Sequence, residues 1–244
     1  MPEEKQTGDG TPFDFRTTRW SMIVLAGKGG NGAGAALEQL CETYWLPLYA
    51  FARRSGLGAE ESKDMTQEFL SHMLAKGALG KADPEKGRFR TYLLSCMKNL
   101  LTSEYRKSAR LKRGGGEVIF SLDAKSAEDA YINEPVDGEM TPDNLFDRRW
   151  AETLVDRVIE RLREEWESAG KPFEQLKTFL VDPRGSTPIA EVAAELGTTG
   201  SALKTSIHRL RRRYGEIFRE EVAHTVADES EVEGEIRYLL SMLG

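Results

Sequence analysis

The sequence predicts an all-α chain of two small helical domains joined by an acidic linker, the second domain ending in a helix-turn-helix. Three observations predict this. Apolar residues recur at helical spacing along most of the chain, as at Leu37, Leu40 and Tyr44. Short apolar runs such as 118–120 are too few to form a sheet. From about 117 to 144, a stretch rich in Ser, Asp, Glu, Asn, Pro and Gly shows little periodicity and separates two helical parts.

Composition bounds the function. A length of 244 residues fits one or two domains, and 39% hydrophobic content is enough for a core. No apolar run approaches the roughly 20 residues of a membrane span, and the polar N-terminus is unlike a signal peptide. Cys41 and Cys96 are isolated, so we expect reduced thiols in a cytoplasmic protein. The three histidines lack metal-ligand spacing, so we expect no metal site.

Charge is segregated along the chain. The net charge of −6 averages over segments of opposite sign. Residues 86–113 hold nine Lys and Arg against one Glu, and 203–219 hold six against one. Residues 117–147 hold nine acids against one Lys, and the tail 220–244 holds seven against one Arg. Two basic modules joined by an acidic strap are typical of a protein that contacts nucleic acid.

The first helical part follows a polar tail over 1–17. A stripe from Leu37 to Phe51 predicts a helix, with Pro47 expected to kink or break it. Met65, Phe69 and Met73 mark a second helix. A third, long helix carries an apolar side and a separate stripe at i,i+4 spacing, formed by Lys98, Thr102, Arg106 and Arg110. Such a stripe suits DNA phosphates, while an amide at Asn99 pairs with base edges and a ring at Tyr105 stacks on unpaired bases.

A glycine motif before the first helix needs separate consideration. Residues 27–32, GKGGNG, match G-x-G-x-x-G between a strand-like run and a helix, which is the context of a dinucleotide-binding loop. A second parallel strand ending in an acid is required next, but residues 52–64 are not an apolar strand. We therefore interpret the motif as a glycine-rich connection. A nucleotide-binding enzyme remains a hypothesis that depends on this loop alone.

The second helical part begins near Trp150 and ends in residues 187–214, the most informative stretch of the chain. Ile189, Val192, Ala193 and Leu196 recur at helical spacing before a turn at Gly197, and Leu203, Ile207 and Leu210 resume the period. Thr187 and Pro188 suit the start of the first helix, and Thr198 or Thr199 the cap of the next. A small residue, a glycine turn and a basic second helix in this register predict a helix-turn-helix, whose second helix enters the major groove.

Together these motifs resemble the sigma-70 family of bacterial RNA polymerase sigma factors, specifically the small extracytoplasmic-function (ECF) type. Residues 58–74, GAEESKDMTQEFLSHML, are similar to the family's D-A-E-D-x-x-Q-E-x-F helix, and residues 89–106, FRTYLLSCMKNLLTSEYR, to its F-R-x-W-L-x-x-I-A-x-N-x-x-x-D-x-x-R stretch. The helix-turn-helix resembles sigma domain four. The resemblance divides the chain into a tail (1–17), domain two (18–113), the acidic linker (114–145), domain four (146–220) and an acidic C-terminal extension (221–244).

The resemblance implies a transcription initiation factor that binds core RNA polymerase and promoter DNA, with no cofactor and no catalysis of its own. It assigns polymerase contact to Asp64, Gln67, Glu68 and Phe69. It assigns the −10 element to Lys98, Asn99, Tyr105, Arg106, Arg110 and Arg113. At the −35 element the expected base readers are Ser201, Lys204, Thr205 and His208, with Arg209, Arg211 and Arg212 on phosphates. The alternative is a helix-turn-helix regulator that binds operator DNA without polymerase.

Departures from the family pattern suggest how the protein is controlled. Lys63 stands where the family has an acid, and Ser206 where it has an arginine. The chain also resembles an ECF subgroup associated with Ser/Thr kinases, which implies a kinase or an anti-sigma factor as a further partner. Phosphorylation of Ser62 or Thr66 would restore negative charge beside Lys63. Residues 232–243 form an amphipathic pattern, expected to pack on the chain itself or to dock a partner.

Overall fold

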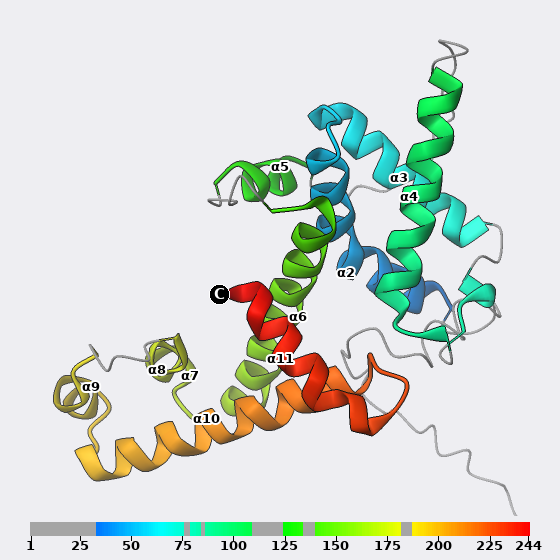
Figure 1. Ribbon diagram of the computed structural model, residues 1–244. Coiled ribbons are helices and arrows are strands. Elements are labelled where there is room, and N and C mark those ends of the chain that lie inside the picture. The colour runs from blue at the N-terminus through cyan, green and yellow to red at the C-terminus, as the bar shows by residue number, and fades with distance from the viewer. Residues whose placement is uncertain (1–32, 76–78, 84–85, 109–123, 134–139, 182–186) are drawn as a thin grey trace, which may run out of the picture.

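The computed structural model describes residues 33–75, 79–83, 86–108, 124–133, 140–181 and 187–244, which are all-α, as the sequence predicts (Figure 1). The first half contains α2 (Ala33–Arg54), α3 (Ala59–Ala75), the 3-10 helix η1 (Leu79–Lys81), α4 (Phe89–Ser108) and α5 (Ala124–Asn133). The second half contains α6 (Pro142–Ser168), α7 (Phe173–Leu176), α8 (Thr178–Val181), α9 (Ile189–Glu195), α10 (Gly200–Ala223), the 3-10 helix η3 (Glu229–Glu231) and α11 (Val232–Leu243). Predictions on residues 1–32, including the tail and the glycine loop, lie outside the described residues.

Helix α2 forms the middle of the first half. Its apolar stripe is buried as the periodicity predicts, with Leu40, Tyr44, Leu48 and Phe51 each at most 5% exposed. The helix runs through Pro47 to its end at Arg54, so the expected break does not occur. Buried side chains on both sides of the proline hold the helix together, because their packing outweighs the loss of one backbone hydrogen bond.

Helix α6 joins the two halves into one core. Thr141 caps its start by accepting a hydrogen bond from the backbone N–H of Asn144 at 3.2 Å, and Pro142 occupies the first turn. Its apolar stripe, which includes Phe146 and Trp150, packs against α2, while α6 also contacts α10 and α11. The predicted domains therefore follow one another along the chain, but in space the described parts of both halves share a hydrophobic cluster.

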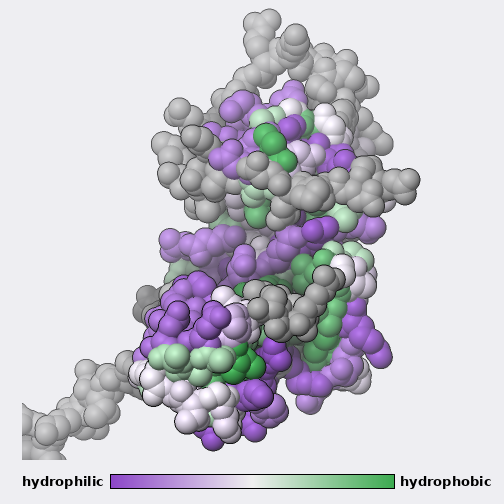
Figure 2. Space-filling view, turned by 90° about the vertical axis from the view of Figure 1, so that its left-hand side faces the viewer, coloured by the Kyte–Doolittle hydropathy of each residue, from purple (hydrophilic) through white to green (hydrophobic). Residues whose placement is uncertain are grey.

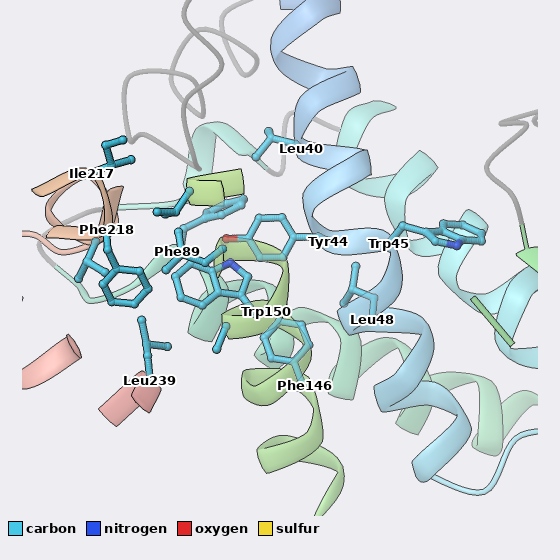
Figure 3. Packing of buried hydrophobic residues seen from close by; sticks show 14 of the residues in the cluster. Leu40, Tyr44, Trp45, Leu48, Phe89, Phe146, Trp150, Ile217, Phe218 and Leu239 are labelled. Carbon is cyan, nitrogen blue, oxygen red and sulfur yellow. The ribbon is translucent and has the colours of Figure 1, made fainter. Parts of the chain in front are cut away.

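Figure 3 shows the centre of this cluster. Tyr44 of α2, Phe89 of α4 and Trp150 of α6 point toward one another, and the Tyr44 and Phe89 rings meet edge to face at 5.6 Å. Phe218 of α10 and Leu239 of α11 lie on one side of this group, whereas Trp45 points away from it. Aromatic side chains from four helices thus bring the N-terminal and C-terminal parts of the chain together.

Helix α5 corrects the prediction of a linker without regular structure. Residues 124–133 form a helix that packs on α2, with Ala127 buried. Glu128 accepts hydrogen bonds from the Tyr49 hydroxyl and from Arg53, whose Nη2 lies 3.0 Å away. The acidic residue that the sequence placed on a solvated strap is thus neutralised by α2. The neighbouring segments 114–123 and 134–139 lie outside the described residues.

Ion pairs fix α10 along α6. The guanidinium of Arg213 forms two hydrogen bonds with the Glu165 carboxylate, at 2.7 and 2.9 Å. Arg161 bonds Glu220 and Glu221 on the next turns of α10, at 2.6 and 2.9 Å. Hydrogen bonds from Arg213 hold the pKa of Glu165 below its ordinary value. Because the pairs are partly buried and arranged as a network, they orient α10 more firmly than isolated surface pairs would.

Candidate nucleic-acid interface

The hairpin of α9 and α10 is built by a tight turn. Gly197 has φ +60°, a left-handed conformation that glycine adopts without strain. The hydroxyl of Thr199 accepts a hydrogen bond from the backbone N–H of Ala202 at 3.2 Å and caps α10. Ala193, 4% exposed, is the small residue between the helices. At the start of α9 the prediction is corrected: the cap position is Pro188, without a side-chain cap hydrogen bond, so Thr187 lies before it.

Helix α10 exposes one polar face. Leu203, Ile207 and Leu210 are buried, and at 100° per residue the opposite side carries the predicted base readers. The exposed residues of α10 that the sequence assigned to DNA are Ser201, Lys204, Thr205, His208, Arg209, Arg211 and Arg212. Figure 2 looks at the side on which α9 and the start of α10 lie, where hydrophilic residues alternate with smaller apolar patches. The structure thus brings these side chains together on an accessible surface.

The arginines of α10 divide into different roles. Arg211 donates two hydrogen bonds to the Phe179 carbonyl oxygen of α8, at 3.0 and 2.8 Å, so its guanidinium is occupied within the protein. Arg212 is 72% exposed, and its side chain pairs with Glu216 one turn away on the same helix, at 3.3 Å. Arg213 joins α10 to α6, a positioning role that sequence reasoning missed. The partners Phe179 and Glu165 are 32 and 48 residues distant, so no local pattern indicated them.

Helix α4 presents part of its predicted stripe. Lys98, Asn99 and Thr102 are exposed. The ammonium of Lys98 lies 2.5 Å from the carboxylate of Asp143, in the first turn of α6, so an acid from the second half already neutralises it. Tyr105 and Arg106 lie in α4, but their side chains are outside the described part of the structure, as are residues 110 and 113 altogether.

Helix α3 presents an acidic surface. Asp64 and Glu68 are exposed and Gln67 is half-buried. Glu61 is exposed too, and its carboxylate accepts the backbone N–H of Gly58 at 3.0 Å, which closes the start of the helix. Phe69, by contrast, is 3% exposed and belongs to the core. The direct polymerase contact expected of Phe69 is therefore corrected: its ring supports the helix from within.

The proposed phosphorylation sites are contradicted. Ser62 and Thr66 are both 0% exposed. Ser62 lies two turns and Thr66 one turn before Leu70 on the buried stripe of α3, so a kinase cannot reach either hydroxyl in the folded chain. The Thr66 hydroxyl donates to the Ser62 carbonyl at 2.7 Å, and among the described residues the Ser62 hydroxyl has no hydrogen-bond partner. A phosphate on either hydroxyl would place a charge of about −1.5 to −2 at a fully buried position.

Three surfaces on α3, α4 and α10 are exposed to a partner. The described residues of this all-α chain carry three exposed polar surfaces: the acidic face of α3, part of α4, and the face of α10 that begins after the Thr199 cap. The described helices are each too short or too polar to cross a bilayer.

Comparison with known proteins then narrows the class. Residues 40–111, which span most of α2, all of α3 and all of α4, match the family described as Sigma-70 region 2. Neither the curated proteins nor the solved structures compared with the chain gave a match. The region 2 match supports a sigma factor of the sigma-70 family, and it implies general sigma-factor function with core RNA polymerase and promoter DNA as partners.

Proposed function

We propose that this chain is a sigma factor of the small ECF type that places core RNA polymerase on a promoter by contacting the −35 duplex and the −10 element. The polar face of α10 carries the proposal beyond region 2. It lies opposite the buried stripe of a helix that is capped by Thr199 and braced by Arg213. The face therefore reaches DNA without unpacking the protein.

The −35 contact would use the first turns of α10. In helix-turn-helix proteins the N-terminal residues of the second helix meet base edges in the major groove. Ser201, Lys204, Thr205 and His208 occupy these turns. The free backbone N–H groups and positive dipole end of the helix favour a nearby phosphate. Arg209 and Arg212 follow on the exposed side, where they would contact phosphates and fix the register.

The −10 contact would use α4. Asn99 offers an amide with two donors and an acceptor oxygen that pair with base edges. Lys98 supplies charge for a phosphate once Asp143 has moved away. Tyr105, Arg106, Arg110 and Arg113, whose side chains lie outside the described part, keep the roles predicted from the sequence: stacking on an unpaired base and neutralising the strand.

Core polymerase would bind the exposed acidic surface of α3. Asp64 and Glu68 lie on this surface with Gln67 beside them, and Glu60 and Glu61 extend it to the start of the helix. These acids offset Lys63, which stands where the family has an acid. The protein would need no catalytic group of its own and would act in the cytoplasm, where the polymerase works.

Transcription with purified components tests the proposal. Holoenzyme assembled from the full chain and core polymerase is presented with a fragment library of the source genome, and the run-off products are sequenced. We expect defined start sites that are absent without the chain, and Lys204→Ala should change which −35 sequences are selected. An operator-binding regulator, the second candidate, would instead bind the same duplexes with equal affinity whether or not core polymerase is present, and would yield no run-off product.

A further inference from the structure

A buried charge cluster joins α4, α6 and α11. It consists of Arg88 and Arg90 at the start of α4, Asp147 of α6, and Glu235 and Tyr238 of α11. Glu235 is 0% exposed and Arg90 is 3% exposed. We call these five residues the latch cluster. They belong to segments nearly 150 residues apart, and α11 lies in the extension beyond the predicted domain four.

The contacts within the latch cluster are close. Arg90 Nε lies 3.0 Å from Asp147, and its Nη1 pairs with one carboxylate oxygen of Glu235. The other Glu235 oxygen lies 2.7 Å from Arg88. The Tyr238 hydroxyl donates to Asp147, so α11 contacts both arginines and α6 at once. The guanidinium of Arg90 is also 4.7 Å from the centre of the Trp150 ring and 5.7 Å from that of Tyr238.

The buried position of these charges determines what each contact contributes. Burial by itself would lower the pKa of Arg90, but Glu235 and Asp147 hold that pKa above its ordinary value, so the guanidinium remains protonated. A buried ion pair gains little net stability, because desolvating its charges offsets their attraction. Removing one partner, however, leaves an uncompensated buried charge. The cluster therefore specifies where α11 docks more than it strengthens the fold, and the docked state depends on every member.

Docking of α11 has a consequence for the face of α4. Asp147 lies one helical turn after Asp143, the residue paired with Lys98. Tyr238 of α11 and Arg90 of α4 both bind the Asp147 carboxylate, so docked α11 adds a further connection between α6 and α4 to the packing of α6 on α2. In this arrangement Asp143 pairs with Lys98, which the proposed function assigns to the −10 strand. In this position a carboxylate takes the place of a DNA phosphate.

We propose that α11 is an intramolecular latch that keeps the start of α6 on α4 and so lowers the affinity of region 2 for single-stranded DNA. Release of Glu235 from the two arginines undocks α11, loosens α6 and frees Lys98. The proposal rests on the proposed function for its DNA partner. It gives the acidic extension a role that neither region 2 nor the α9–α10 hairpin requires.

Two measurements on the full-length chain test the latch. Hydrogen exchange reports whether α11 and the start of α6 are docked. Fluorescence anisotropy with a labelled 20-nucleotide single strand of mixed sequence reports the affinity of the basic face. The test variant is Glu235→Gln, which keeps the side-chain shape and removes the charge. Its matched control is Glu233→Gln on the same helix: Glu233 is 57% exposed, its only described partner is the exposed Arg219 of α10, and its replacement changes the net charge equally.

We expect Glu235→Gln to speed exchange in α11 roughly tenfold or more, since a buried partner is lost, and Glu233→Gln to leave it unchanged. Affinity for the single strand should rise at least threefold in Glu235→Gln over the control, because the competent state is more populated. Tyr238→Phe, which removes only the hydroxyl that bonds Asp147, should act in the same direction and more weakly. Circular dichroism confirms that each variant keeps its helices.

The possible results separate the latch from the proposed function. Unchanged exchange in both Glu235→Gln and Tyr238→Phe overturns the latch. Faster exchange without a gain in affinity over the control also overturns it, since α11 would then be a structural element only. If no chain, wild type included, binds the single strand or supports run-off transcription with core polymerase, the proposed function fails, while the exchange data still decide whether α11 undocks.

Discussion

Replacement by alanine should lower the thermal stability at Arg211 and weaken the phosphate contact with DNA at Arg212, its neighbour. Arg211 donates two hydrogen bonds to the Phe179 carbonyl and holds α8 against α10. Hydrogen bonds from a charged group are worth about 1.5–3 kcal/mol, and exposure of Arg211 places it at the lower end, about 1.5 kcal/mol. For a chain of this size that corresponds to a fall of about 3–6 °C in Tm. Arg212 makes an exposed i,i+4 pair with Glu216, worth about 0.3–0.5 kcal/mol.

The assay pairs thermal unfolding with salt-dependent binding of holoenzyme to a −35 duplex. Arg212→Ala should leave Tm nearly unchanged and reduce the slope of log K against log salt by about one unit, as expected for one lost phosphate contact. Arg211→Ala should lower Tm and leave that slope unchanged. Lys at each position is the control that keeps the charge. If Arg211→Ala changes the slope while Arg212→Ala does not, α10 meets DNA through its other side, and our assignment of its faces is wrong.

Further predictions concern α3, α4 and α5. Ser62→Glu and Thr66→Glu should each destabilise the chain by roughly 3 kcal/mol or more in denaturant unfolding, because each buries an unpaired charge; tighter binding to core polymerase without loss of stability would contradict the buried positions. Asn99→Ala combined with Tyr105→Ala should impair promoter opening more than closed-complex binding, and equal permanganate reactivity in mutant and wild type would refute the −10 assignment. Burial opposes ionisation of Glu128, yet hydrogen bonds from α2 hold its pKa below the ordinary glutamate value. Docking of α5 should therefore be fully stable at neutral pH and weaken as pH falls through that lowered pKa, with the amide protection factors of α5, taken relative to intrinsic exchange at each pH, falling in acid; Glu128→Gln should remove this pH dependence.

Local patterns in the sequence determined the helices and the turn between α9 and α10. Helix formation depends on contacts three and four residues apart, so the stripe of Leu203, Ile207 and Leu210 showed which side of α10 is buried. The turn needed a residue that tolerates positive φ, which Gly197 provides. The face of α10 that carries Ser201 and Lys204 followed from the same periodicity.

One error was avoidable from the sequence. Ser62 and Thr66 fall on the stripe that continues to Leu70 and Met73, so helical spacing already indicated their burial. Their hydroxyls suggested a surface role, because serine and threonine are mostly exposed in folded proteins. The position of each residue on the helix, and not its residue type, decided whether it is buried.

The tertiary structure alone decided which charges are available to a partner. Arg211 and Arg212 are adjacent and chemically identical, yet Arg211 bonds the Phe179 carbonyl of α8, whereas Arg212 is exposed and pairs with Glu216 of its own helix. Lys98 pairs with Asp143, which is 45 residues away, and the buried Glu235 pairs with Arg88, just before α4, and with Arg90 in its first turn. Such pairings depend on how α6 and α11 pack across the chain. Helical periodicity specifies which side of each helix is apolar, but it contains no information about which distant helix covers it.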